Sequence, residues 1–185
     1  MKKRKSVMLF LVKFFCSYFL LFGIYSYYLF STQIKGTLFA CAPITTAVGE
    51  QTISVLKYIG YNARLEQHTQ ELSIKLILNE VYLARVIEGC NSLSIIILFI
   101  AFIIAFPGPF RKTLLYAFSG SVIIYVVNVF RIAFLTVALA EFPSHKEILH
   151  NLVFPSLIYG LVFLLWVVWV NYFSNYKEVR NEKNI

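Results

Sequence analysis

Residues 114–139 read LLYAFSGSVIIYVVNVFRIAFLTVAL, and this stretch indicates the solvent in which the chain folds. Its only charged side chain is Arg131, and Asn128 lies one helical turn earlier. At about 1.5 Å per residue, a helix of this length exceeds the roughly 30 Å hydrocarbon core of a bilayer. The stretch is therefore predicted to be a transmembrane helix.

The composition of the whole chain agrees with a membrane protein. Of its 185 residues, 59% are hydrophobic and only 14% are charged, whereas soluble domains carry about a quarter charged residues. The net charge of +8 does not indicate a nucleic-acid partner, because the basic residues cluster at the two termini and in one short loop. That distribution is typical of anchoring at the cytoplasmic side of a lipid bilayer.

Four apolar stretches predict about four membrane crossings, at residues 7–30, 91–107, 114–139 and 152–172. Residues 31–89 are too polar to span and are expected to form a small α+β cap. Thr45 to Ile59 has the spacing of an amphipathic helix, and the alternation after Glu71 predicts a strand that turns at Asn79-Glu80 into a hairpin partner. The predicted fold is an all-α membrane bundle with this cap, and residues 1–185 form a single integral membrane domain.

The basic residues also predict the orientation. Nine of them lie on the side of the N-terminus, and six are spread over the longer segments of the other side. Because short cytoplasmic segments are enriched in Lys and Arg, both termini are expected in the cytoplasm. The cap and the 141–151 loop are then extracytoplasmic, in a multi-pass protein of the bacterial inner membrane.

Arg131 is the strongest sign of a functional site. A charged side chain inside a span costs at least about 2.5–3.5 kcal/mol, so it is expected to face the bundle interior or a water-filled cavity. Asn128 lies on the same helical face and is expected to line that cavity. The alternative is an arginine that pairs with a helix-end carbonyl or with Glu141 and only fixes packing.

Cys90 and His150 are predicted on the same outer side as the end of that helix. Cys90 stands where the cap enters the second span, and a helix N-terminus favours a thiolate. His150 opens the last span and can supply the imidazole that activates a cysteine nucleophile, whereas His145 lies in the exposed turn. The three cysteines form no CxxC motif, so neither a disulfide framework nor a metal site is indicated, and no cofactor is expected.

The order of these motifs is similar to that of the exosortase/archaeosortase family, closest to the short exosortase F group. The matching residues are Glu88-Gly89-Cys90-Asn91-Ser92-Leu93-Ser94, then Asn128-Val129-Phe130-Arg131-Ile132, then His150, and the similarity covers about residues 45–170. Many members have Cys-Ser-Gly where this chain has Cys90-Asn91-Ser92.

The resemblance implies a membrane-embedded cysteine protease or transpeptidase that cleaves C-terminal sorting signals of membrane-anchored proteins. Cys90 would be the nucleophile, His150 the general base and acid, and Arg131 the group that steadies the oxyanion or the substrate. Asn128 and Asn91 are expected to line the substrate site. The alternatives are a non-catalytic assembly factor, a protein that binds sorting signals without cutting them, and a protein in which Arg131 and Asn128 line a path for small polar molecules.

Overall fold

The computed structural model describes residues 2–35, 39–106 and 108–174, and the predicted basic tail with Lys177, Arg180 and Lys183 lies outside these residues. The chain divides into two compact units. The helical unit comprises Met1–Ser26, Ser94–Ile124 and Tyr159–Ile185. The sheet unit comprises Tyr27–Leu93 and Tyr125–Ile158.

The long helices confirm a largely helical membrane protein. Three described helices are long and apolar enough to span a bilayer: Arg4–Thr32 within α1 (Lys2–Thr32), α4 (Phe110–Glu141), and Asn151–Phe173 around α6 (Phe154–Val168). The remaining predicted span is α3 (Leu93–Ala105), an apolar helix of 13 residues. At about 1.5 Å per residue it measures roughly 20 Å, less than the hydrocarbon core, so the fourth crossing stays a prediction.

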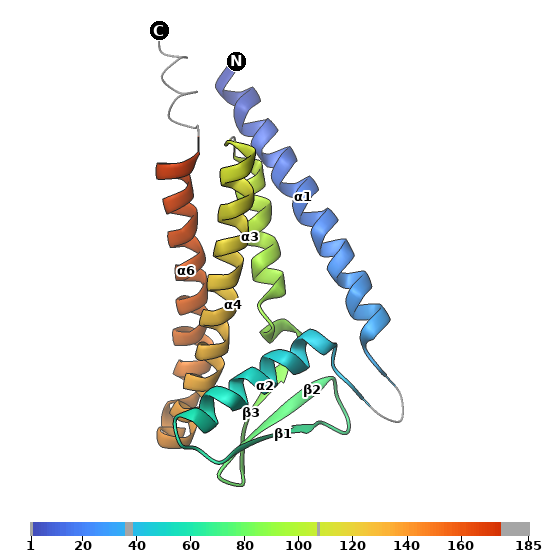
Figure 1. The fold of residues 1–185 in the computed structure, drawn as a ribbon, viewed down its shortest axis with the longest axis vertical. Coiled ribbons are helices and arrows are strands. Elements are labelled where there is room, and N and C mark those ends of the chain that lie inside the picture. The colour runs from blue at the N-terminus through green and yellow to red at the C-terminus, as the bar shows by residue number, and fades with distance from the viewer. Residues whose placement is uncertain (1, 36–38, 107, 175–185) are drawn as a thin grey trace. The chain divides into compact units, whose positions relative to one another are not determined.

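Aromatic packing holds the helical unit together, and its parts of α3, α4 and α6 run side by side (Figure 1). The rings of Phe102 on α3 and Trp166 on α6 stack with centroids 4.3 Å apart. The Tyr116 hydroxyl of α4 donates a hydrogen bond to the Leu165 carbonyl at 2.8 Å. The parts of α3, α4 and α6 that belong to the helical unit therefore pack against one another.

The sheet unit contains a three-stranded antiparallel sheet in the order β1 (Ala63–Gln67), β2 (Ser73–Leu78) and β3 (Val81–Ile87). The predicted hairpin is confirmed, because Leu78 pairs with Val81 across Asn79 and Glu80. Both turn residues have positive φ, as a two-residue type I′ turn requires. The strand β1 was not predicted from the sequence, because it is short and mostly polar.

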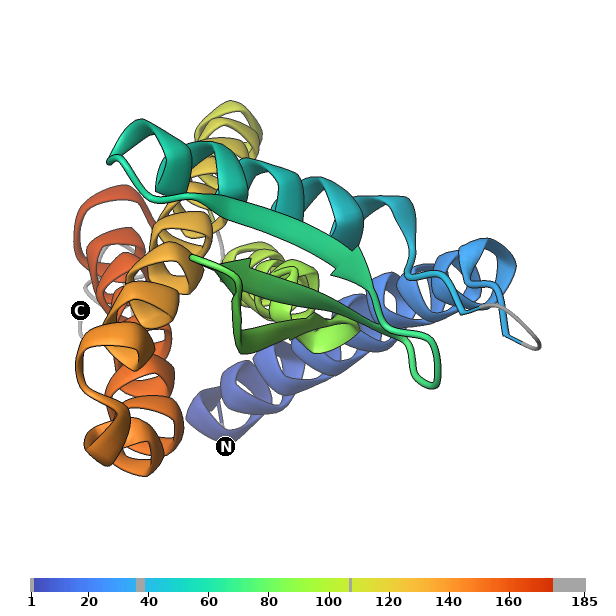
Figure 2. The ribbon, with the colours of Figure 1, turned by 90° about the horizontal axis from the view of Figure 1, so that it is seen from below.

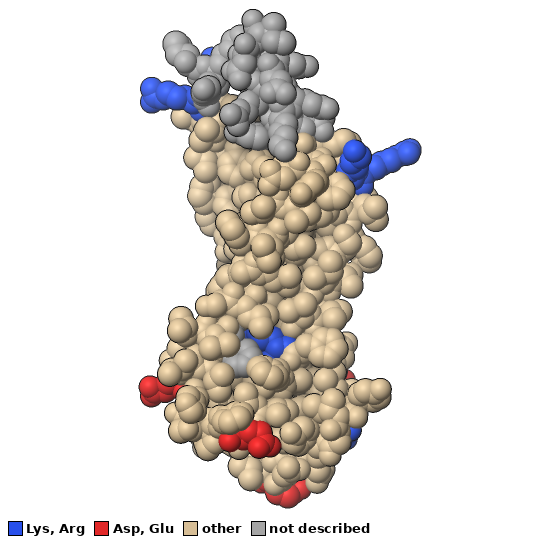
Figure 3. All heavy atoms as spheres, turned by 90° about the vertical axis from the view of Figure 1, so that its left-hand side faces the viewer, with Lys and Arg blue, Asp and Glu red and all other residues tan. Residues whose placement is uncertain are grey.

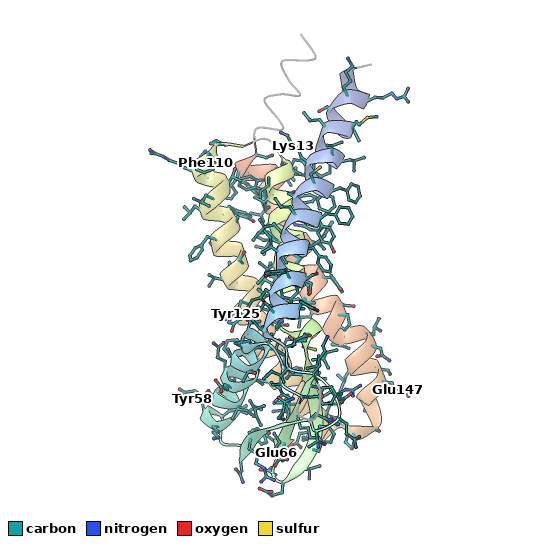
Figure 4. All side chains as sticks on the ribbon, turned by 90° about the vertical axis from the view of Figure 1, so that its right-hand side faces the viewer. Lys13, Tyr58, Glu66, Phe110, Tyr125 and Glu147 are labelled. Carbon is teal, nitrogen blue, oxygen red and sulfur yellow. The ribbon has the colours of Figure 1, made fainter. Side chains whose placement is uncertain are left out.

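The helix α2 (Pro43–Tyr58) runs beside β1 and covers the sheet (Figure 2). It begins at Pro43, whose fixed φ suits the first turn of a helix. Ile59 was expected on its apolar face but lies just beyond the helix and is 54% exposed. Tyr58, the last residue of α2, and Glu66 of β1 are exposed at the surface of this unit (Figure 4).

One apolar core joins α2, the sheet and the C-terminal half of α4. Its buried members come from all three parts: Val48, Ile53 and Leu56 of α2, Ala63, Leu76, Leu78 and Val86 of the sheet, and Val129, Ile132 and Ala133 of α4. The sheet is therefore built onto the same segment of α4 that carries Asn128 and Arg131.

Candidate active site

Cys90 ends a single 3-10 turn, η1 (Glu88–Cys90), between the end of β3 and the start of α3. Its side chain is partly buried and packs at the margin of the core that joins α2, the sheet and α4. Two residues, Asn91 and Ser92, separate it from the first residue of α3. The cysteine therefore stands just before the helix N-terminus, outside the helix itself.

Asn91 forms the cap between Cys90 and α3. Its side chain is completely buried, and its Oδ1 accepts a hydrogen bond from the backbone N–H of Leu93 at 3.0 Å. This bond satisfies one of the backbone donors that a helix leaves without a partner at its first turn. The Asn91 Nδ2 donates to the Thr45 hydroxyl of α2, also at 3.0 Å.

Ser92 completes this connection in a left-handed backbone conformation, with φ of 64°. Glycine adopts this conformation without a steric penalty, and glycine is the residue at this place in the Cys-Ser-Gly pattern. The Ser92 side chain is buried, and its hydroxyl donates to the Asn91 carbonyl at 2.6 Å. The turn after Cys90 thus keeps the path that a glycine would favour.

Glu88 ties the other flank of Cys90 to the start of α2. Its Oε1 accepts from the backbone N–H of Ala42 at 2.7 Å, and its Oε2 accepts from the Thr45 hydroxyl. Ala42 is the N-cap residue of α2, and its own side chain provides no capping bond. The carboxylate therefore closes a helix end whose partial positive charge favours an anion.

Asn128 joins α4 to the cysteine turn. Its side chain is completely buried, and its Nδ2 donates to the Cys90 carbonyl at 2.7 Å. Its Oδ1 is buried and has no hydrogen-bond partner among the described residues. Leaving a buried acceptor without a partner costs about 1–3 kcal/mol, so this oxygen is a destabilising feature among the described residues.

Arg131 lies three residues after Asn128 on α4 and is partly buried. The two residues that follow it, Ile132 and Ala133, belong to the core of the sheet unit. A partly buried guanidinium at this position on the helix is within the same unit as Cys90 and Asn128.

His145 and His150 occupy the connection from α4 to α6. The backbone of His150 lies in a π-helical turn, η3 (Leu149–Val153), and its side chain lies outside the part of the chain that the structure describes. The pairing of His150 with Cys90 therefore stays a prediction. His145 ends the 3-10 turn η2 (Pro143–His145), where it is exposed as expected, with its Nδ1 3.1 Å from the Ser144 hydroxyl oxygen.

The other two cysteines differ from Cys90 in their surroundings. Cys41 is buried, and this burial, followed by the negative charge of Glu88, raises the pKa of its thiol to about 11. It therefore stays protonated at neutral pH and is a poor nucleophile, because only the thiolate attacks. Cys16 is exposed on α1, within the first predicted span.

Thr45 and Glu88 are parts of the site that the sequence did not predict. Glu88 is a carboxylate two residues before Cys90, and this position in the motif is a signal for it in the sequence. Thr45 lies 43 residues from Glu88 along the chain and gave no such signal. Only the packing of α2 onto the sheet brings the two together.

The chain is similar to one family of known proteins. The family model described as Transmembrane exosortase (Exosortase_EpsH) matches residues 6–173, which is nearly the whole chain and includes every residue of the candidate site. No curated protein and no solved structure matches the chain. The match over residues 6–173 makes this chain a member of the transmembrane exosortase family.

Proposed function

We propose that this chain is a membrane-embedded cysteine peptidase or transpeptidase that processes C-terminal sorting signals of membrane-anchored proteins at the outer face. The hydrogen bond from Asn128 to the Cys90 carbonyl carries the proposal. It fixes the cysteine turn against the segment of α4 that also presents Arg131. Within the family, the order of the motifs favours the short exosortase F group.

The proposed reaction is acyl transfer through Cys90. His150 takes the proton of the thiol, and the thiolate attacks the scissile carbonyl to form a tetrahedral oxyanion. Arg131 stabilises this oxyanion, since a preorganised donor in a dry site lowers the barrier strongly. As the thioester forms, the C–N bond breaks and the leaving amine takes the proton from His150. Water or an acceptor amine then attacks the thioester and regenerates the Cys90 thiol.

The two asparagines contribute differently to this proposal. Asn128 supports a direct contact with the substrate, because its buried Oδ1 can accept a hydrogen bond from a substrate N–H beside Cys90. Asn91 has both ends of its amide engaged, with Leu93 and with Thr45. We therefore propose that Asn91 contributes to the substrate site by fixing the conformation of the turn between Cys90 and α3.

The decisive experiment replaces Cys90 with alanine in a strain that contains a protein ending in a short motif, an apolar helix and a basic cluster. Cys90→Ala is expected to insert normally, and the target should accumulate with its C-terminal anchor uncut. Cys90→Ser should be almost as inactive, because a hydroxyl has far less anionic character than a thiol. Mass spectrometry of the target's C-terminus measures the outcome.

The chain offers two matched controls. Cys16→Ala removes an exposed thiol and Cys41→Ala a buried thiol with a raised pKa, and both variants should process normally. Normal trimming in the Cys90→Ala strain would show that the Cys90 thiol is not the nucleophile. If the wild-type protein binds the target and never cuts it, the chain is a sorting-signal binder instead.

A further inference from the structure

We infer that Thr45 and Glu88 are positioning residues, which hold the Cys90 turn in its reactive place through a chain of hydrogen bonds to α2. The inference rests on the proposed role of Cys90 as the nucleophile. Neither side chain needs to touch the substrate for this role. Both act through Asn91 and through the backbone of the turn.

The chain of bonds has one consistent direction. The N–H of Leu93 donates to the Asn91 Oδ1, and the Asn91 Nδ2 donates to the Thr45 oxygen. The Thr45 hydroxyl donates in turn to the Glu88 carboxylate, which also accepts from the N–H of Ala42. Because the Thr45 hydroxyl both donates and accepts, its orientation is fixed at the centre of the chain.

These bonds fix the residues on both sides of Cys90. Glu88 is two residues before it and Asn91 is the next residue, and both are bonded to the same Thr45 hydroxyl. Asn128 fixes the carbonyl of Cys90 itself from α4. A displacement of a reacting atom by about 1 Å can cost about 100-fold in rate, so three such attachments bear directly on catalysis.

Helix capping alone does not require this arrangement. A local Ser or Asp at the position of Ala42 would cap α2, as in most helices. The acceptor for the Ala42 N–H comes instead from Glu88, 46 residues later in the chain. The start of α2 is thereby made part of the support of the cysteine turn.

The test compares two buried threonines of the same helix. Thr45 and Thr52 are both completely buried in α2, and Thr52 donates only to the Val48 carbonyl of its own helix at 2.8 Å. Thr45→Val and Thr52→Val thus make the same chemical change, and only Thr45→Val breaks the series of hydrogen bonds that leads to the Cys90 turn. Thr45→Ser keeps the hydroxyl and serves as the rescue variant.

Two readouts are measured on protein inserted in membranes. The first is trimming of the sorting-signal target described above. The second is the rate at which iodoacetamide alkylates Cys90 at about pH 9.5, where an ordinary cysteine is mostly thiolate, so that the rate reports access to the sulfur. Mass spectrometry of the peptide that carries Cys90 separates this thiol from Cys16 and Cys41.

Thr45→Val is expected to slow trimming at least about tenfold, the equivalent of one lost hydrogen bond, and to speed alkylation of Cys90 several-fold. Thr45→Ser and Thr52→Val should stay within about twofold of the wild type in both readouts, since the chain of bonds is intact in each. Equal values for Thr45→Val and Thr52→Val would overturn the inference.

A second variant covers the case in which Thr45→Val does not accumulate. Glu88→Gln has nearly the same shape, but its amide has one accepting oxygen, so it cannot accept from both the Ala42 N–H and the Thr45 hydroxyl as the two carboxylate oxygens do. It should show the same loss of trimming and gain in alkylation, and wild-type values in both would refute the inference. If Cys90→Ala still trims the target, the proposed nucleophile is wrong, and the alkylation rates still decide whether these bonds hold the turn.

Discussion

The polar side chains around Cys90 divide into those that hold the turn and those left for chemistry. Glu88, Asn91 and Thr45 use their polar atoms on one another and on backbone N–H groups. Asn128 uses only its amide nitrogen in this way among the described residues. These bonds therefore hold the turn that carries Cys90, and the proposed reaction requires its sulfur in a fixed place.

Arg131 is the residue at which a conservative change is most informative. Arg131→Lys keeps the charge but replaces a planar set of donors with a single ammonium group, which cannot reproduce the same directed bonds. The variant should insert and accumulate normally, and target trimming should fall at least about 100-fold, as when an oxyanion donor is removed.

The matched control for this change is Arg64→Lys. Arg64 is exposed on β1 and pairs with Glu66 and Glu80, and exposed ion pairs contribute little. This variant should trim the target at the wild-type rate. Full activity in Arg131→Lys would instead assign the arginine to packing, which was the alternative from the sequence.

The candidate residues of the site follow from the sequence, whereas the bonds between them follow from the structure. A charged residue in a span and a cysteine before a helix are visible in the pattern of residues alone. The bond from Asn128 to the Cys90 carbonyl joins residues 38 apart, and it depends on how the turn meets α4. Such partners follow from packing, so no local pattern could have given them.

Helix packing in the helical unit depends on one close approach. Gly120 of α4 is buried, and a Cβ atom built at this position would overlap the ring of Phe99 on α3. Phe99 is itself completely buried, so its ring has little room to move. The small residue in α4 therefore allows α3 and α4 to pack at this point.

Gly120→Ala is expected to destabilise the protein by about 1–3 kcal/mol, because the added methyl group overpacks the contact with Phe99. The measurement is the thermal unfolding midpoint in detergent, where a protein of this size loses about 2–4 °C per kcal/mol. Gly160→Ala in α6 is the control, since no atom lies within 4 Å of a Cβ built there. The control should be neutral or slightly stabilised, and equal midpoints for the two variants would contradict the packing argument.

Elements with strong periodicity were predicted well, and short ones were not. The hairpin of β2 and β3 follows from regular alternation around Asn79-Glu80. The strand β1 has only five residues and exposes most of them, so its pairing with β2 comes from the sheet rather than from its own pattern. The predicted span at 91–107 is shorter as a helix because Asn91 and Ser92 are used in the cap before α3.

At the scale of the whole molecule, charge distinguishes the two units. Every acidic residue that the structure describes belongs to the sheet unit, where carboxylates are visible on the surface in Figure 3. In the described part of the helical unit the charged residues are all basic: Lys2, Lys3, Arg4, Lys5, Lys13, Arg111 and Lys112. Because basic residues are retained in the cytoplasm, we expect the basic segments of the helical unit, at the start of α1 and at the start of α4, to lie on the cytoplasmic side.

This distribution predicts the topology of the chain. Fusions of a reporter that is active only outside the cytoplasm should give activity after Gln70, none after Lys112, and activity again after Lys146. The first site lies between β1 and β2 of the sheet unit, the second near the start of α4, and the third between α4 and α6. A reporter that is active only in the cytoplasm should give the reverse pattern and controls for expression. The Lys146 fusion matters most, because it reports the side of the membrane on which His150 lies. If the cytoplasmic reporter is active at Lys146, His150 and Cys90 lie on opposite sides of the membrane, and the proposed reaction has no general base. This holds even if the Gln70 and Lys112 fusions give the expected activities.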